Sequence, residues 1–198
     1  MPRRRALTKA QLENLLALPV TEADLVRHWT LGDDDLALVD RRRRIHNQLG
    51  FALQLCALRY PGRLLRPGEI IPQPALRFVA DQLGAAPEVL TTYAVRFQTR
   101  YEQLGALRTA MGFTDLSPQR PEILEWLLPV SLATTNPFTV ATALLEELRR
   151  RRIIVPGPSI VERLVATTLA SAEQHVANQL TGSLTAVQSD ALDALLRR

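Results

Sequence analysis

Hydrophobic and polar residues follow helical spacing from the start of the chain. Thr8 and Gln11 have the spacing of a capping box, in which each side chain accepts the other residue's backbone N–H, and a leucine-rich stretch follows them. Thr21 with Asp24, and then Gly32 before a run of aspartates, mark two more helix starts. The pattern predicts three short amphipathic helices before residue 40.

The stretch from Ile45 to Tyr60 has a different pattern, because apolar residues fill two stripes of it at helical spacing. A helix with so little polar surface should lie at the centre of the fold. What remains polar is one strip at helical spacing, made of His46, Asn47, Gly50 and Gln54, and we expect this strip to face a ligand. No glycine or proline marks a turn near residues 43–45, so residues 34–59 are predicted to form either one helix or two.

Four prolines and two glycines interrupt the helical pattern between residues 61 and 74. Such a density stops helices and marks a linker or a long loop. Helical spacing then returns, and we predict helices at about 75–83, 87–94, 99–111, 121–132 and 137–152. Asn136 followed by Pro137 is a favourable start for the last of these.

Two further helix starts follow near the end of the chain. Ser159 with Glu162 predicts a long helix, and Thr185 with Gln188 predicts a last helix that reaches Arg198 without a cap, as expected of a piece of a longer chain. The sequence therefore predicts an all-α protein with two groups of short helices, each resembling helix-turn-helix modules, joined by a Pro/Gly-rich loop. We expect a first module at 1–66, a linker at 67–74, a second module at 75–182 and the start of a further helix at 183–198.

Composition supports helices and shows where the charges lie. Hydrophobic residues make up 46% of the chain and aromatic residues only 5%, so the core must be built mainly from aliphatic side chains, which suit helix packing. Residues 1–70 hold 12 basic and 8 acidic side chains, residues 71–148 hold 5 and 8, and residues 149–198 hold 7 and 4, so both ends are basic. Of the 24 basic residues only Lys9 is lysine. A GC-rich genome would explain the excess of arginine but not its clustering.

Three arginine clusters are candidate DNA contacts, because guanidinium groups bind phosphate and guanine through paired hydrogen bonds. Arg41–Arg44 directly precedes the polar residues His46–Gln48, which is the order of parts in a helix-turn-helix. Four consecutive arginines cannot share one face of a helix, so a solvated charged face is the alternative. Arg149–Arg152 ends a predicted helix, where the macrodipole favours cations whatever their function, and Arg3–Arg5 is typical of a flexible basic arm.

No catalytic or metal-binding pattern accompanies these clusters. The sequence has no phosphate-binding glycine loop, no paired CxxC and no HExxH motif. Asp33–Asp35 can in principle bind a cation, but carboxylates at a helix start more often serve as caps. The single cysteine, Cys56, lies in an apolar run and is expected in the core of a protein from a reducing cytosol. No run approaches the length of a membrane span, so we expect a cytoplasmic, nucleoid-associated protein with no membrane partner.

Several blocks of the sequence resemble the N-terminal region of transposases of the Tn-three family, which transpose replicatively through cointegrates. The most specific block is NQLGFALQLCALRYPG at Asn47–Gly62, and Met1–Arg4, Asp35–Val39, Arg149–Pro156 and Ile160–Arg163 also match. The resemblance therefore reaches nearly the whole chain.

The resemblance implies helical modules that recognise the terminal inverted repeats of a transposon, within a transposase whose Mg²⁺-dependent, RNase H-like catalytic domain lies outside this chain. It implies no catalytic residue, metal or cofactor for this region. The expected partners are double-stranded DNA, the remainder of the transposase and, for the full-length protein, a second copy. Gln48 stands where the family often has arginine. Glutamine at this position would lose a phosphate contact but could still form hydrogen bonds with adenine.

Sequence-specific binding of duplex DNA is therefore the leading hypothesis. The alternatives are a helical protein-interaction module of the same transposase and, last, a stand-alone enzyme, for which no convergent acid, base or nucleophile is found. The candidate DNA-binding residues are Arg3, Arg4, Arg5, Arg41, Arg42, Arg43, Arg44, His46, Asn47, Gln48, Gln54, Arg59, Arg63, Arg149, Arg150, Arg151 and Arg152.

Overall fold

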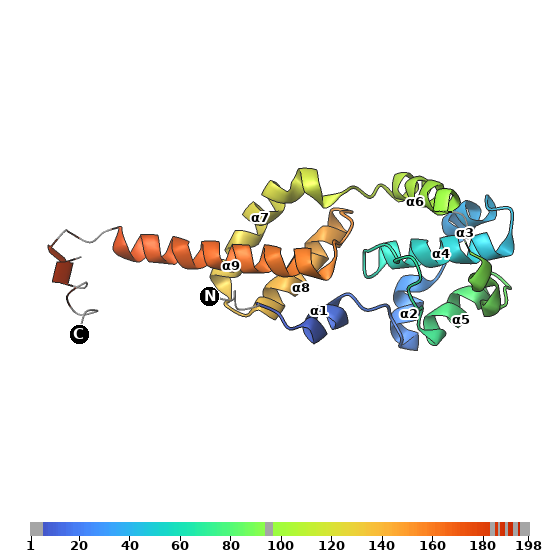
Figure 1. Cartoon of the computed structure of the whole chain (residues 1–198), viewed down its shortest axis with the longest axis horizontal. Helices are drawn as coiled ribbons and strands as arrows, with labels where there is room; N and C mark the ends of the chain where they lie inside the picture. The colour runs from blue at the N-terminus through green and yellow to red at the C-terminus, as the bar shows by residue number, and fades with distance from the viewer. Residues whose placement is uncertain are drawn as a thin grey trace.

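The computed structural model describes residues 6–93 and 97–182, with only the backbone at 97–100, and residues 185, 187, 188, 190, 191 and 194 beyond them. The helices are α1 (Lys9–Leu15), α2 (Glu22–Trp29), α3 (Asp33–Asp40), α4 (Ile45–Arg59), α5 (Gln73–Gln82), the 3-10 helix η1 (Pro87–Thr92), α6 (Phe97–Met111), α7 (Leu116–Ala133), α8 (Pro137–Arg150) and α9 (Pro158–Thr181). These described ranges contain no β-sheet, and their one β-type contact is an isolated bridge between Thr114 and Ile153. The all-α prediction is confirmed (Figure 1).

Several helix starts lie where the side-chain caps predict them. The Thr8 hydroxyl accepts the backbone N–H of Gln11 at 3.2 Å, and the Gln11 amide oxygen accepts the N–H of Thr8 at 2.9 Å. Thr21 and Asn136 cap α2 and α8 through N–H groups two or three residues farther on, and the capping box at 185–188 also forms. Local hydrogen bonds to otherwise unpaired N–H groups therefore decide these boundaries.

Several helix starts differ from the prediction, and α5 and α6 each begin two residues early, at Gln73 and Phe97. Helix α7 begins at Leu116 and not at residue 121, because Pro118 falls in its first turn, where an N–H would have no helical partner. Helix α9 begins at Pro158, so Ser159 lies inside the helix and is not its N-cap. The first error comes from taking Pro118 as a break when it lies in the first turn of a helix, and the second from taking Ser159 as a cap when the helix already begins at Pro158.

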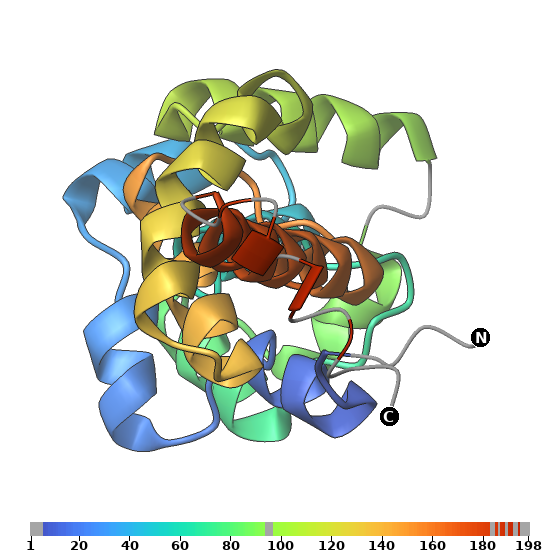
Figure 2. The same ribbon diagram turned by 90° about the vertical axis from the view of Figure 1, so that its left-hand side faces the viewer.

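Two hydrophobic clusters hold the helices together. The first is built from α2, α3, α4 and α5, with side chains of η1 and α6 against it, and the second from α1, α7, α8 and α9. The clusters lie end to end along the long axis of Figure 1, and Figure 2 shows α7 and α8 beside α9, which is seen nearly end on. This packing runs across residues 67–74, because α5 packs on α2 and α4 while α1 packs on α9. The division into folding modules at 67–74 stays a prediction.

The turn that follows α4 joins the two clusters. The carbonyl oxygen of Gly62 accepts the N–H of Val155 at 2.9 Å, and the N–H of Ile154 donates to the carbonyl of Thr114 at the same distance. Gly62 has a φ of +97°, and a Cβ atom there would lie 2.8 Å from Cγ of Arg149. Only glycine combines that backbone conformation with so close an approach. The extended segment before α9 is thus held between the end of α4 and the start of α7.

Aromatic side chains hold α2 against the end of α4. The indole N–H of Trp29 donates to the carbonyl oxygen of Tyr60 at 2.8 Å, and the Tyr60 ring stacks on His28 with the centroids 4.2 Å apart. Burial, together with the charges of Arg27 and Arg149, lowers the pKa of His28 in spite of nearby Asp24. The ring of His28 therefore stacks in its neutral form at neutral pH.

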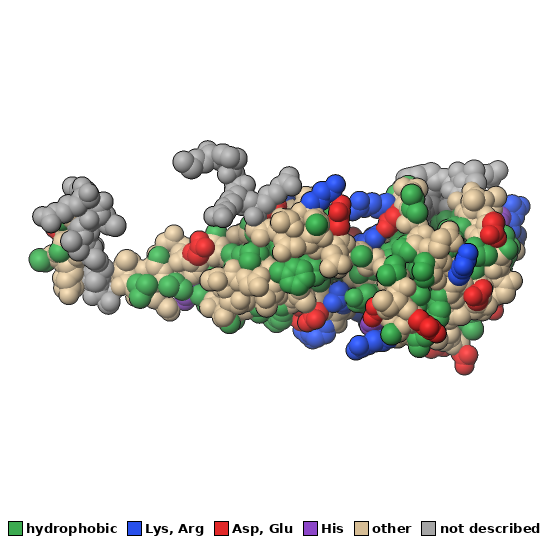
Figure 3. All heavy atoms as spheres, turned by 90° about the horizontal axis from the view of Figure 1, so that it is seen from below, with side chains coloured by type: hydrophobic (Ala, Val, Ile, Leu, Met, Phe, Trp, Pro, Cys, Tyr) green, Lys and Arg blue, Asp and Glu red, His purple; other side chains and the backbone are tan. Residues whose placement is uncertain are grey.

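Helix α9 continues beyond the helices that support it. Its buried positions end at Ala172, and residues 173–182 are all exposed. Val176 and Leu180 continue the apolar stripe and are 43% and 70% exposed. Figure 3 shows hydrophobic side chains along this projecting part of the helix.

The docking of η1 on α4 depends on Gly50. A Cβ atom at Gly50 would lie 2.1–2.4 Å from three ring carbons of Tyr93, which is far closer than van der Waals contact. The ring therefore lies directly on the backbone of α4 where Gly50 leaves room for it.

We predict that Gly50→Ala lowers the free energy of unfolding by about 1–2 kcal/mol, because displacing Tyr93 outweighs the helix propensity gained by alanine. Gly105→Ala is the matched control, since nothing lies within 4 Å of a Cβ atom at that position of α6. It should leave stability unchanged or raise it by up to about 1 kcal/mol. Chemical denaturation measures both, and equal effects at the two glycines would contradict the packing described.

Ion pairs close the last turn of α8 around Glu147, whose side chain is 4% exposed. Its carboxylate accepts hydrogen bonds from Arg150 at 2.6 and 2.7 Å and from Arg151 at 2.5 Å. The bonds from Arg150 lower the pKa of Glu147, burial opposes them and the bond from Arg151 adds to them, so that the pKa is about 2.

This pKa predicts a pH-dependent contribution to stability. Because an unfolded glutamate has a pKa of about 4.3, the contribution of charged Glu147 is complete above about pH 5 and is lost as the pH falls toward about 2. Glu147→Gln should therefore lower the free energy of unfolding by about 1–2 kcal/mol at pH 7 and by clearly less at pH 3. Glu146→Gln, at the exposed neighbouring position, should show no such difference. Equal losses at both pH values for Glu147→Gln would sink the prediction.

Candidate nucleic-acid interface

The four arginines at 41–44 form the turn between α3 and α4. Helix α3 ends at Asp40, and Arg44 has extended backbone angles, φ −128° and ψ 138°, at the start of α4. The carbonyl of Arg44 accepts the N–H groups of Asn47 and Gln48 at 2.8 and 2.9 Å. Residues 34–59 are therefore two helices joined by a turn, the arrangement that a helix-turn-helix requires.

Three of these four side chains are free to meet a ligand. Arg41, Arg43 and Arg44 are exposed and make no hydrogen bond or ion pair with any described residue. Arg42 is half-buried, with its guanidinium carbon 4.3 Å from the centroid of the Phe51 ring. The turn therefore presents unneutralised positive charge to solvent.

The first turn of α4 lies beside this charge and stays partly accessible. Ile45 is 39% exposed and His46, Asn47 and Gln48 are half-buried, whereas every residue at 49–58 is buried. The N-cap residue of α4, Arg44, makes no side-chain capping hydrogen bond, so the macrodipole of the helix adds partial positive charge at the same place. The site combines cations, helix N–H groups and polar side chains that suit an anion beside a hydrogen-bonding surface.

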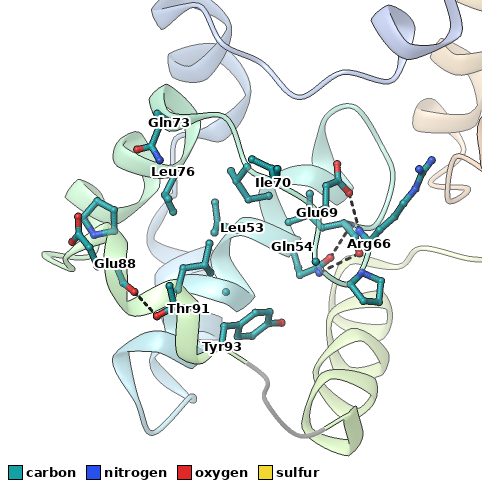
Figure 4. Close-up of a pocket in the computed structure, with 17 residues that line it drawn as sticks. Leu53, Gln54, Arg66, Glu69, Ile70, Gln73, Leu76, Glu88, Thr91 and Tyr93 are labelled. Carbon is teal, nitrogen blue, oxygen red and sulfur yellow. Dashed lines mark hydrogen bonds between the residues drawn. The ribbon is translucent and has the colours of Figure 1, made fainter. Parts of the chain in front are cut away.

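The far end of the expected polar strip does not face a ligand. Gly50 is covered by Tyr93, and Gln54 is 1% exposed with its amide paired to the backbone of Leu65: its oxygen accepts at 3.0 Å and its nitrogen donates at 3.5 Å. Gln54 lies at the wall of a cavity of about 630 Å³ between α4, α5, η1 and the 65–71 loop (Figure 4). The expectation of a ligand-facing Gln54 is therefore corrected, because the core takes up both of its hydrogen-bonding groups.

Arg59 and Arg63, both candidates, are held by partners inside the protein. Arg59 donates to the Thr30 carbonyl at 2.9 Å and to the Asp35 carboxylate at 2.6 Å. Arg63 pairs with both carboxylate oxygens of Glu69 and donates to the Leu16 carbonyl at 2.9 Å. These arginines tie α3 to α4 and the 63–69 loop to the end of α1, so the structure places them in the fold and not in a free basic surface.

The second arginine run is also taken up largely by internal contacts. Arg149 donates to the carbonyl of Pro61 at 3.4 Å, and burial lowers its pKa. Arg150 and Arg151 pair with Glu147, and Arg152 donates to the carbonyl of Met111 at 3.1 Å. The run fixes the end of α8 to α6 and to the turn after α4. Arg3, Arg4 and Arg5 lie outside the described residues.

The acidic residues that pair with the arginines were not identified from the sequence. Asp35 lies 24 positions from Arg59 in the chain, and no local pattern predicts that pair. Glu147, by contrast, precedes Arg150 and Arg151 at i,i+3 and i,i+4 spacing, which is a readable signal of a helical ion pair. The presence of acidic partners therefore distinguishes the paired arginines at 149–152 from the exposed arginines at 41–44, although the two runs have the same length.

The described residues show neither a metal site nor a membrane-spanning helix. They contain no group of three or more His, Cys, Asp and Glu side chains placed to hold a metal ion. No helix found there has both the length and the apolar character needed to cross a membrane. Burial raises the pKa of Cys56 to about 12, so the thiol stays protonated.

Comparison with known proteins identifies the family. Residues 6–168 match a domain of unknown function, DUF4158. The chain is 39% identical to the transposase for transposon Tn3926 and 38% identical to that for transposon Tn21, both from Escherichia coli, and 38% identical to that for transposon Tn501 from Pseudomonas aeruginosa. Each match covers 100% of this chain and 20% of the relative, so the chain spans about a fifth of the length of these proteins. The chain thus belongs to the DUF4158 family and corresponds to the N-terminal region of transposases of the Tn-three family.

Proposed function

We propose that this chain binds duplex DNA sequence-specifically at the terminal inverted repeats of a transposon, as the N-terminal part of a transposase. The main support is the position of Arg41, Arg43 and Arg44, which are exposed and unpaired among the described residues beside the accessible first turn of α4. A transposase must distinguish the ends of its element from other DNA, and this surface has the chemistry to do so. Such a role places the protein on the nucleoid.

The two parts of the surface would have different tasks. The exposed arginines contact phosphates, which gives affinity that falls with salt but little discrimination between sequences. Asn47 and Gln48 carry amide groups that can pair with the donor and acceptor of adenine in the major groove. His46 lies between these amides and the arginines in the sequence and can donate to either phosphate or base.

Strand cleavage and joining would reside in the part of the transposase beyond this region. The relatives are about five times as long as the matched segment, which leaves room for a complete catalytic domain. We expect Mg²⁺ to bind in that domain and no cofactor to bind here. Duplex DNA and the remainder of the transposase are the proposed partners, with homodimerisation of the full-length protein as a further expectation.

Replacing Arg41 and Arg43 together by alanine should weaken DNA binding about tenfold or more at physiological salt, with similar losses for specific and scrambled duplexes. Two lost phosphate contacts should also reduce the slope of log K against log salt by about 1.8. Arg163→Ala is the control, since Arg163 is exposed on α9, a helix of the second hydrophobic cluster, and makes no hydrogen bond or ion pair with a described residue. Fluorescence anisotropy over a salt series measures this. An unchanged slope in the double variant would exclude the turn as the phosphate contact.

Asn47→Ala should act on discrimination. The preference for a terminal-repeat duplex over a scrambled one should fall about tenfold, while binding to the scrambled duplex stays nearly constant. Competition at physiological salt measures both quantities. A wild-type chain that showed no preference for the terminal repeat would contradict specific recognition itself.

The projecting end of α9 supports a second candidate function, a protein-interaction module. Leu132, Val176 and Leu180 line an apolar groove that is open to solvent. Because about four-fifths of each relative lies outside the matched region, the proposed occupant of this groove is the remainder of the transposase. Replacing Leu180 by serine should then reduce assembly of the complete transposase without altering DNA binding by this region. Self-association of the 198-residue chain through this groove would instead identify a second copy as the occupant.

A further inference from the structure

Arg42 differs from the three arginines around it because the protein holds its side chain in one place. Its guanidinium carbon lies 4.3 Å from the centroid of the Phe51 ring, and Phe51 is 1% exposed. Nε of Arg42 is buried and has no hydrogen-bond partner among the described residues. The cation–π contact with Phe51 is therefore the contact that fixes this guanidinium.

Phe51 also has a defined relation to the accessible turn of α4. It follows Asn47 by four positions, so the two side chains lie on the same face of the helix, one turn apart. A guanidinium stacked on Phe51 is therefore placed on the face of α4 that carries Asn47. A cation already ordered there loses less conformational freedom on contact with an anion than a freely rotating arginine does.

We propose that Phe51 is a positioning residue for nucleic-acid binding: its ring holds the Arg42 guanidinium beside Asn47, where that cation contacts a DNA phosphate. This inference rests on the proposed function and goes beyond it, since it assigns a buried core residue a part in affinity. Phe51 itself touches no DNA and acts only through Arg42. The competing explanation is that Arg42 and Phe51 merely close the hydrophobic core at the turn.

A double-mutant cycle separates the two explanations. Arg42→Ala, Phe51→Leu and the double variant are compared for binding to a terminal-repeat duplex, with thermal stability measured in parallel. Phe51→Leu should weaken binding about threefold to tenfold in the wild-type background and have no further effect once Arg42 is alanine. Losses that multiply in the double variant, or no loss in Phe51→Leu, would overturn the proposal.

Phe78→Leu is the matched control for lost core packing. Phe78 lies on α5 and packs against the same hydrophobic cluster, and no arginine is stacked on it among the described residues. It should lower stability without changing DNA affinity. A loss of affinity as large as that of Phe51→Leu would show that weakened packing alone explains the effect.

A second variant keeps the proposal testable if Phe51→Leu does not fold. Arg42→Lys retains the charge but replaces the planar, stacking guanidinium by a compact ammonium, so it should lose most of the affinity lost in Arg42→Ala. Arg43→Lys, at an exposed and unstacked position, should change affinity less than twofold. Full binding by Arg42→Lys would overturn the positioning role while leaving DNA binding intact, whereas a wild-type chain that binds no duplex would refute the proposed function itself.

Discussion

Burial of α4 is the constraint on which the rest of the site depends. Every residue of this helix at 49–58 is buried, in contact with α2, α3 and α5 and beneath η1. A helix that is buried over most of its length cannot place that whole length in a groove of DNA. It can offer only its first turn, and that turn lies next to four arginines because α3 ends just before them.

The distribution of acidic side chains then separates arginines that look equivalent in the sequence. Arg59, Arg63, Arg150 and Arg151 each have a carboxylate partner, and Arg149 and Arg152 donate to backbone carbonyls across the junction between the clusters. These contacts join the helices and loops, and removing one partner of the largely buried Arg63–Glu69 pair would leave the other uncompensated. Charge available for a ligand is concentrated where such partners are missing, at 41–44.

The sequence predicted the helices well because helical spacing recurs along the chain and several helix starts are decided by local hydrogen bonds, as at Thr8 and Asn136. It indicated the arginine turn and the polar residues that follow it as candidate DNA contacts, and the structure leaves Arg41, Arg43 and Arg44 of that turn exposed. It could not show that Gln54 turns into the core or that Asp35 neutralises Arg59, because both depend on how neighbouring segments pack and not on a local helical pattern. The stacking of Arg42 on Phe51 likewise depends on the angle between the turn at 41–44 and α4, which residue spacing does not give.

Hydrogen–deuterium exchange of the chain with and without a terminal-repeat duplex tests the central claim most directly, because it reports on every described segment at once. The account predicts that DNA slows exchange at residues 41–48, where the N-terminus of α4 is uncapped, and leaves residues 149–152 and 173–182 unchanged. Protection at 149–152 or along the end of α9, with none at 41–48, would contradict it.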